Sequence, residues 1–321
     1  MGRVRSGFGA IDSERSKRHR KGRYEGHHLN VTETVLITGG AGSLGRMLTE
    51  RFASAGYLVR IFDLPAMDFS GLEDRSEIQI FRGDITDRES VSEAVAGVDA
   101  VVHLAALLPP RAEQNRDLTM AVNLGGTRTI LEAMESGSPG GRLVFASSVS
   151  TYGDTSGDNP PVTPDHPQRA TDIYAESKIA AESVIKESRV NSVILRIAPI
   201  AVPAFLEPPD VWPFTSGQRV EMVHRDDVVD AIFNAVSADA AVGKALNIAG
   251  GPTWQLDGKR YVEDFYDFVG APSDDATYRT TPGWVDWYDT SDSQPILGFQ
   301  NRSYQHYSQE MRDLVAELME G

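Results

Sequence analysis

The stretch from 35 to 45 reads Val35-Leu36-Ile37-Thr38-Gly39-Gly40-Ala41-Gly42-Ser43-Leu44-Gly45. Its first four residues are apolar or β-branched, which favours a buried strand, and its glycines recur with GxxGxxG spacing. Glycines permit a tight turn and a close approach of the backbone to a pyrophosphate, while the following helix offers free N–H groups at its N-terminus. The stretch therefore predicts a strand, a turn and a helix that bind a dinucleotide. A turn that merely connects a strand to a helix is the alternative.

From residue 31 onward, short β-branched runs alternate with amphipathic segments. This alternation predicts an α/β fold, a doubly wound parallel (Rossmann) sheet with helices on both faces. We expect strands at residues 34–38, 58–62, 78–82, 100–104, 142–147, 192–197 and 245–248. We expect helices at residues 44–55, 88–96, 122–135, 174–187, 226–237, 262–269 and 309–319.

The composition changes after residue 198, because five prolines fall between residues 199 and 213 and disfavour regular structure there. We therefore expect a dinucleotide-binding domain over residues 31–198. Residues 199–321 then form mainly a small substrate-binding lobe, with 224–250 returning to the core of the first domain.

Charge is distributed unevenly along the chain. Residues 1–30 hold eight of the 31 basic side chains and three of the 46 acidic ones, so the remainder carries a formal charge of −20. An acidic body argues against nucleic acid as the main partner, since phosphate neutralisation needs a basic face. The basic segment 1–30 is interpreted as a disordered tail; a nucleic-acid arm is the alternative.

Two absences narrow the classes further. The chain has no cysteine, which excludes disulfides, thiolate metal sites and a cysteine nucleophile, and we expect no metal site. No apolar run approaches the roughly 20 residues that span a bilayer, and residues 1–30 lack the apolar core of a secretory signal. We expect a cytoplasmic protein with a small-molecule substrate and no membrane partner.

Two carboxylates follow predicted strands. Asp63 ends the second strand, 18 residues after Gly45, where a carboxylate can bind the adenosine ribose hydroxyls and would repel a 2′-phosphate. Asp84 ends the third strand and is placed to reach the adenine amino group, although an Asp that caps a loop would look the same. The first carboxylate favours NAD over NADP as the cofactor.

The second informative string is Tyr174-Ala175-Glu176-Ser177-Lys178. On a helix, positions i and i+4 share a face. A tyrosine has an ordinary pKa near 10, but a neighbouring ammonium and a positive nicotinamide ring stabilise its phenolate. Tyr174 can then take a proton from a substrate hydroxyl, although a YxxxK string by chance is common.

Seven motifs in order give the chain its family resemblance. After residue 31 it resembles the extended short-chain dehydrogenase/reductases of the NAD-dependent epimerase/dehydratase family. The motifs are the glycine turn, Asp84-Ile85, His103-Leu104-Ala105-Ala106, Asn123 in Val122-Asn123-Leu124-Gly125-Gly126-Thr127, Ser147-Ser148 with Tyr152-Gly153, the Tyr174/Lys178 pair, and Val223-His224-Arg225-Asp226-Asp227-Val228.

The resemblance implies roles for particular residues. Ser148 would bind the substrate oxygen, Tyr174 would be the acid/base, and Lys178 would anchor the nicotinamide ribose. The implied cofactor contacts are Gly39, Gly42, Ser43, Leu44, Gly45, Asp63, Asp84, Ile85, Leu104, Ala105, Ala106, Asn123, Tyr174, Lys178 and Pro199. For the substrate we expect Leu107, Ser148, Phe205 and Trp212. The resemblance also implies a homodimer.

Departures from the family's patterns exclude several reactions. Similar 4,6-dehydratases and decarboxylases carry acids just after the catalytic hydroxyl residue, where this chain has Val149-Ser150, and 3,5-epimerising members use a cysteine. Nucleotide-sugar relatives have a longer segment than the 28 positions from Arg196 to His224. They also hold the diphosphate with arginines where Val220 and Thr281 stand here, although Arg219 and Arg279 lie nearby.

We therefore expect an NAD-dependent oxidoreductase that acts on a secondary alcohol or ketone of a small sugar, sugar acid or similar metabolite. One alternative is a nucleotide-sugar 4-epimerase. Another is a regulatory protein that binds NAD without turnover, which the presence of Ser148, Tyr174 and Lys178 disfavours.

Overall fold

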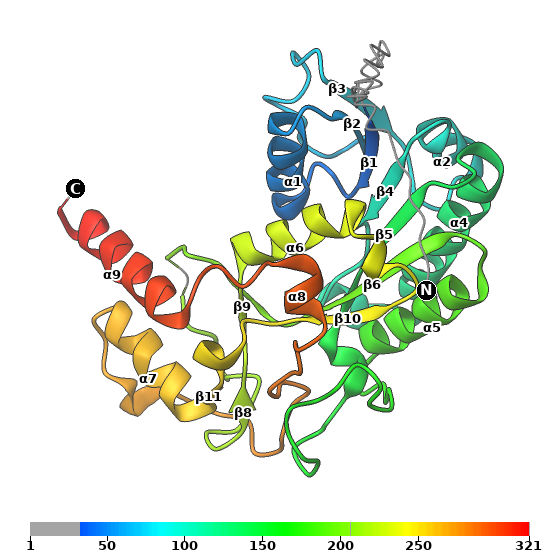
Figure 1. Ribbon diagram of the computed structural model, residues 1–321. Helices are drawn as coiled ribbons and strands as arrows, with labels where there is room; N and C mark the ends of the chain where they lie inside the picture. Colours follow the sequence, from blue (N-terminus) through cyan, green and yellow to red (C-terminus); the bar gives the residue numbers. More distant parts are fainter. Residues whose placement is uncertain (1–32, 206, 321) are drawn as a thin grey trace, which may run out of the picture. The chain divides into compact units, whose positions relative to one another are not determined.

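Seven parallel strands form the central sheet of the computed structural model, which describes residues 33–205 and 207–320 (Figure 1). Each lies within one residue of its predicted bounds, so the predicted doubly wound α/β fold is confirmed. The strands are β1 (Thr34–Thr38), β2 (Leu58–Asp63), β3 (Ile78–Arg82), β4 (Ala100–His103), β5 (Arg142–Ser148), β6 (Asn191–Ile197) and β10 (Ala245–Ile248).

The order of the strands determines where a ligand can enter. It runs β10-β6-β5-β4-β1-β2-β3, so the chain moves outward from β1 to β3 and then crosses back to β4. Thr38 at the end of β1 is in register with Phe62 on β2 and with His103 on β4. Loops leave the sheet in opposite directions at this reversal, and in open α/β sheets the crevice between them is the usual ligand site.

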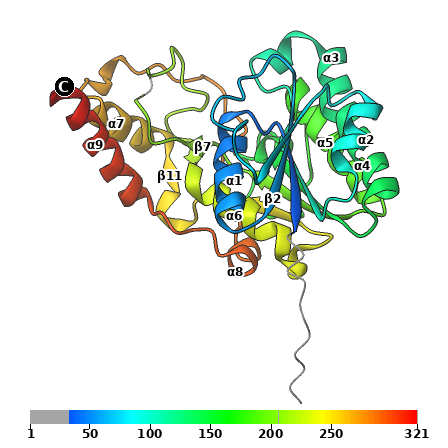
Figure 2. The same cartoon turned by 90° about the horizontal axis from the view of Figure 1, so that it is seen from above.

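Helices cover both faces of the sheet. Figure 2 shows α1 (Ser43–Ser54) and α6 (Arg225–Ser237) on one face and α2 (Arg88–Val95), α4 (Gly126–Gly137) and α5 (Ile173–Glu187) on the other. Successive residues of a strand point to opposite faces of the sheet, and the residues on both faces are buried. The strands therefore read as nearly continuous apolar runs, which is typical of a covered parallel sheet.

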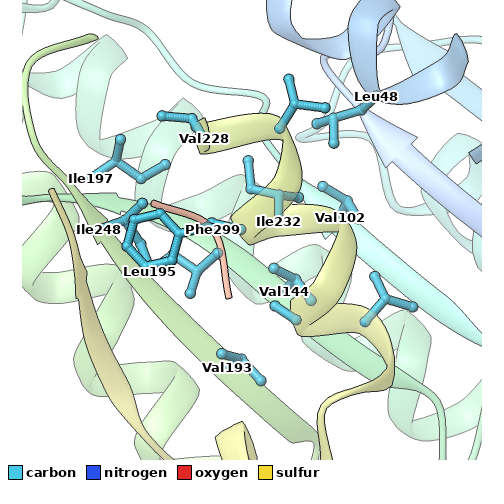
Figure 3. Packing of buried hydrophobic residues seen from close by; sticks show 14 of the residues in the cluster. Leu48, Val102, Val144, Val193, Leu195, Ile197, Val228, Ile232, Ile248 and Phe299 are labelled. Carbon is cyan, nitrogen blue, oxygen red and sulfur yellow. The ribbon is translucent and has the colours of Figure 1, made fainter. Parts of the chain in front are cut away.

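The core beneath α1 and α6 shows this packing directly. Val102 and Val144 from neighbouring strands meet Leu48 of α1 and Ile232 of α6, and all four are shielded from solvent (Figure 3). The buried residues on the other face of the sheet, which include Leu36 and Val101, pack against α2, α4 and α5.

The C-terminal lobe has its own aromatic core. Helices α7 (Gly258–Phe268) and α9 (Tyr304–Glu320) contribute to it, beside the antiparallel pair β8 (Arg219–Val220) and β11 (Leu256–Asp257). The short strands β7 (Ile200–Ala201) and β9 (Val223–His224) pair in parallel, and α8 (Ser293–Leu297) lies near α6. Helix α7 begins four residues before the prediction because Asp257 caps it, accepting a hydrogen bond from the Arg260 backbone N–H at 2.8 Å.

The helix predicted over residues 122–135 is interrupted in the structure. A short helix α3 (Arg116–Met120) leads into a π-helical turn (Ala121–Gly125), and α4 begins only at Gly126. The wide turn contains Asn123, whose side chain is buried. Such turns are frequent at functional sites, and amphipathic periodicity does not reveal them.

The sequence also predicts a basic tail and the lack of a membrane-spanning segment. The predicted basic tail over residues 1–30 lies outside the described residues. Within the part of the chain that the structure describes, no helix combines the length and the apolar character needed to cross a membrane.

Candidate active site

The glycine turn lies where the strand order reverses. Gly39 has φ +71°, a left-handed conformation that glycine favours, and its N–H donates to the Phe62 carbonyl at 2.9 Å. A Cβ on Gly45 would lie 2.4 Å from the Gly39 carbonyl oxygen, so a side chain there would displace the turn. No side chain caps α1 at its N-cap residue Gly42, which leaves first-turn N–H groups of that helix for a ligand.

A cavity of about 740 Å³ opens directly on this turn. It runs from the glycine turn, past the carboxyl ends of the central strands, to helix α5. Its lining includes Gly39, Gly42, Ser43, Leu44 and Gly45. An uncapped helix N-terminus, a turn without side chains and a long cavity together suit an extended dinucleotide that carries a pyrophosphate.

The two predicted carboxylates line the cavity at the ends of β2 and β3. Asp63 accepts hydrogen bonds from the backbone N–H groups of Ala41 at 3.0 Å and Leu64 at 2.9 Å. It therefore fastens the glycine turn while each carboxylate oxygen keeps acceptor capacity for a ligand. Asp84 accepts from the Thr86 N–H at 2.9 Å, so it caps its own loop as well as lining the cavity. Ile85, which follows it, also lines the cavity.

The segment after β4 forms a further wall. Leu104, Ala105, Ala106 and Leu107 all line the cavity. Asn123, which the sequence analysis expects to contact the cofactor, is not part of the lining, so its direct contact with the cofactor stays a prediction. Its side-chain oxygen accepts from the Leu107 N–H at 2.7 Å, and its amide nitrogen donates to the Leu107 carbonyl and to Ser177 Oγ. Asn123 thus holds the wall from behind.

Ser148, Tyr174 and Lys178 line the same cavity as the glycine turn. Ser148 is the last residue of β5, and its Oγ accepts a hydrogen bond from the Ser150 N–H at 3.1 Å. Asp172 caps α5 by accepting from the Ala175 N–H at 2.7 Å, which begins the helix just before Tyr174. Helical spacing then brings Lys178 beside Tyr174, with Nζ 5.7 Å from the tyrosine ring centroid.

Burial controls the protonation of this group. Burial raises the pKa of Tyr174, and the nearby Asp172 carboxylate raises it further. Burial lowers the pKa of Lys178 to about 8, against the opposing charge of Glu182. In the protein alone, the phenol is therefore protonated at neutral pH and the amine is mostly charged. The expected stabilisation of a phenolate requires charge beyond that of Lys178, such as a positive nicotinamide ring.

A hydrogen bond and a contact with an aromatic ring fix the position of the Lys178 ammonium. Its Nζ donates to the Ala146 carbonyl at 2.7 Å and lies 4.6 Å from the Phe145 ring centroid. Behind it, His103 hydrogen-bonds Thr38 Oγ1 at 2.7 Å. Burial, together with the Lys178 charge, lowers the pKa of His103 to about 3, so this imidazole is neutral at physiological pH.

A buried ionic network lies one turn further along the same face of α5. Glu182, one turn beyond Lys178, accepts from Ser147 Oγ at 2.6 Å and pairs with Arg196 of β6 at 2.7 Å. The Arg196 guanidinium also donates to the Tyr152 hydroxyl at 2.9 Å. Sequence reasoning missed this network. Its one available signal was Glu182 itself, a charged residue four positions after Lys178 on the same helix.

Two predicted substrate contacts lie elsewhere. Trp212 is buried in the core of the C-terminal lobe, with its ring centroid 5.2 Å from that of Phe265, and it is not part of the cavity lining. Phe205 is half exposed and also outside the lining. Neither ring therefore lines the cavity in this structure, and contact of either with the substrate stays a prediction.

Other side chains take those places in the cavity wall. Pro199, Ile200 and Val202 line it from the segment after β6, and Trp284 lines it from the C-terminal lobe. The lining also includes two arginines that sequence reasoning did not assign, Arg111 and Arg225.

Comparisons with curated proteins extend these observations. The 3 beta-hydroxysteroid dehydrogenase/Delta 5→4-isomerase of Mycobacterium tuberculosis is 26% identical to this chain over 83% of it and 66% of the relative. D-erythronate dehydrogenase of Cupriavidus necator is 35% identical over 52% of this chain and 55% of the relative. The chain thus spans less than two thirds of the length of the first curated relatives it matches.

A solved structure shows the same fold. The short-chain dehydrogenase/reductase superfamily protein from Agrobacterium tumefaciens with bound NAD has a TM-score of 0.75 and 22% identity, and the match covers 89% of this chain and 98% of that one. The sequence model of the NAD dependent epimerase/dehydratase family matches residues 35–249, which is more than half of this chain. The chain therefore belongs to the NAD-dependent epimerase/dehydratase family, and NAD is its cofactor.

Proposed function

We propose that the chain is an oxidoreductase that interconverts a secondary alcohol and a ketone on a small sugar, sugar acid or similar metabolite. Bound NAD supplies the hydride acceptor for oxidation, and its reduced form supplies the donor for reduction. The observation that carries the proposal is that Ser148, Tyr174 and Lys178 line the same cavity as the glycine turn.

The hydrogen bonds of the three side chains suit this chemistry. Ser148 Oγ already accepts from a backbone N–H, so its own hydrogen remains free to donate to a substrate oxygen. One Nζ hydrogen of Lys178 goes to the Ala146 carbonyl, which leaves two donors for the hydroxyls of the nicotinamide ribose. Tyr174 exchanges the substrate proton: its phenolate accepts the proton during oxidation, and its phenol donates one during reduction.

The positions of Arg219 and Arg279 favour a substrate without a diphosphate. Arg219 was one of two residues that could replace the missing diphosphate ligands, but its Nε is bound to Asp286 at 2.5 Å and it does not line the cavity. Nη2 of the same guanidinium donates to backbone carbonyls, including that of Asp158 at 3.1 Å. Arg279, the second, is not part of the cavity lining either. This favours a small substrate over the nucleotide sugar of a 4-epimerase.

The substrate is tested by following the absorbance of reduced nicotinamide with the full chain, NAD and a panel of alcohols. The panel contains aldoses, uronates, hydroxy acids, 3-hydroxysteroids and UDP-sugars. Net reduction with a small sugar or sugar acid is expected. Interconversion of UDP-sugars with no net reduction would identify a 4-epimerase instead. A protein that binds NAD and converts no member of the panel would favour the regulatory alternative. The homodimer implied by the resemblance stays a prediction.

Replacing Asp63 with Ala should relax the preference for NAD. The carboxylate is proposed to bind the adenosine ribose hydroxyls and to repel a 2′-phosphate, so its loss should weaken NAD binding roughly 10- to 100-fold while NADP gains. Titration of each dinucleotide by calorimetry measures the ratio. Asp84→Asn is the matched control: because adenine is common to both dinucleotides, the ratio should not change. An unchanged ratio in Asp63→Ala contradicts the assignment.

NAD binding should weaken as pH rises through about 8, the pKa of Lys178. The charged ammonium is the stronger hydrogen-bond donor to the ribose, and it is lost on deprotonation. We expect the dissociation constant to rise roughly three- to tenfold between about pH 7 and pH 9. Burial raises the pKa of Tyr174 above this pH range and lowers the pKa of His103 below it, so neither group titrates there. In Lys178→Met, binding should be weaker and flat with pH; a rise that persists in this variant would assign it to another group.

A further inference from the structure

Arg111 occupies a defined position beside the proposed reaction centre. It begins a short 3-10 helix (Arg111–Gln114) and lines the cavity together with Ser148, Tyr174 and Lys178. Two residues later in the same turn, Glu113 accepts hydrogen bonds from the backbone N–H groups of Ile173 at 2.9 Å and Tyr174 at 3.0 Å. The turn that carries Arg111 is therefore fastened to the first turn of α5, next to Tyr174.

The charge on Arg111 has no acidic partner within the part of the chain that the structure describes. The other arginine in the cavity wall, Arg225, donates from Nε to Asp226 at 3.0 Å and is partly neutralised. Glu113 is engaged at both oxygens by α5 N–H groups. Asp63 ends β2 and Asp84 follows β3, away from the α5 side of the cavity. A protein of formal charge −15 thus presents an unpaired cation to its own cavity.

Arg111 is itself exposed to solvent, and its neighbours in the cavity wall are largely apolar. Leu107 and Leu108 precede it in the same wall, and Trp284 contributes a further large apolar surface to the cavity. An anionic group that entered these surroundings would lose water, which is costly unless a charged partner replaces it. A neutral substrate group could accept a hydrogen bond from the guanidinium but would gain no charge attraction from it. Arg111 therefore favours a substrate with one negative group over its neutral analogue.

We infer that Arg111 forms an anion subsite for the carboxylate of a small hydroxy acid, whose secondary hydroxyl lies at Ser148 and Tyr174. The inference rests on the proposed function and names the substrate class. A planar guanidinium matches a carboxylate with two parallel hydrogen bonds. A diphosphate would need further cations, and Arg219 is already held by Asp286 outside the cavity.

The experiment compares matched substrates with the full chain and NAD. The probes are hydroxy acids and sugar acids of about three to six carbons, the primary amide of each acid, and the corresponding sugar phosphates. The variants are Arg111→Met, which removes the charge, and Arg111→Lys, which keeps it without the planar fork. Arg189→Met is the control, because Arg189 is exposed before the amino end of β6, at the opposite end of that strand from the cavity.

We expect the wild-type protein to prefer each reactive acid over its amide by at least about tenfold in kcat/KM. Arg111→Met should lower kcat/KM for the acid by roughly 10- to 100-fold, mainly through KM, and should leave the amide within about twofold. Arg111→Lys should recover part of this loss. Arg189→Met should behave as the wild type, and NAD affinity should be unchanged in Arg111→Met, which shows that the variant is folded.

The contrary outcomes separate the two proposals. Equal rates with acids and amides, or an equal loss with both in Arg111→Met, overturns the subsite and leaves the proposed oxidoreductase standing. A preference for sugar phosphates that Arg111→Met removes overturns the carboxylate assignment. Protein that binds NAD but oxidises neither acids, amides nor phosphates, nor the neutral sugars and steroids of the wider panel, contradicts the proposed function itself.

Discussion

Replacement of Tyr174 with Phe should lower kcat/KM by about 10²- to 10⁴-fold, the range that a positioned general acid or base supplies. The substitution removes one hydroxyl and keeps the ring that packs beside Lys178. Without the hydroxyl, the proposed acid/base is gone, because the remaining Lys178 donors are assigned to the nicotinamide ribose and not to the substrate oxygen. Rates of NAD reduction with the best alcohol of the panel measure the effect.

The Tyr174→Phe experiment needs evidence that the cavity survives. NAD affinity should stay within a few fold, since the ring and the helix cap at Asp172 remain. Tyr57→Phe is the matched control: Tyr57 packs edge-on against Phe52 near the end of α1, and its loss of a hydroxyl should leave kcat/KM unchanged. A loss smaller than about tenfold in Tyr174→Phe would remove Tyr174 from the role of acid/base.

Replacement of Arg196 with Met should reduce the free energy of unfolding by about 3–5 kcal/mol, because it leaves the buried Glu182 carboxylate with only the half-exposed Lys186 ammonium, 3.5 Å away, as a cationic partner. Glu182 is fully shielded from solvent, and Arg196 is 2% exposed. Although burial opposes ionisation, the Arg196 guanidinium holds the pKa of Glu182 below its ordinary value. Urea unfolding followed by circular dichroism measures the loss.

A second variant distinguishes loss of pairing from loss of packing. In Glu182→Gln/Arg196→Met the buried charge is gone, so part of the stability should return. Glu187→Ala is the control on the same helix; its side chain is exposed, and the change should stay within about 0.5 kcal/mol. A loss below about 1 kcal/mol in Arg196→Met, or no recovery in the double variant, contradicts a structural role for the pair.

The strands and the larger helices could be predicted because their signals are local. Parallel strands buried on both faces appear as short apolar runs such as residues 100–104, and the cluster of glycines marks the turn after β1. The π-helical turn at Ala121–Gly125 could not be predicted in the same way. Asn123 in this turn accepts a hydrogen bond from the Leu107 N–H and donates one to Ser177 Oγ, and both partners come from outside the turn.

The residues of the candidate site fall into the same two groups: those that a local sequence motif places and those that only contacts with other elements place. Tyr174 and Lys178 share a helix face by spacing alone, and Ser148 follows a recognisable strand, so a motif can place all three. Trp212 and Phe205 lie in a segment without regular periodicity, where the direction of a ring depends on the packing of the C-terminal lobe. Arg111 belongs to no motif, and the backbone N–H groups of Ile173 and Tyr174 that donate to Glu113 hold its turn beside Tyr174.

The central claim is that one cavity holds NAD between the glycine turn and the Ser148, Tyr174 and Lys178 side chains. A crystal structure of the full chain grown with NAD tests it most directly. We predict the adenosine ribose hydroxyls within hydrogen-bond distance of the Asp63 carboxylate, and the nicotinamide ribose hydroxyls within the same distance of Lys178 Nζ. NAD bound outside this cavity, or a nicotinamide ring directed away from Tyr174, would contradict the account.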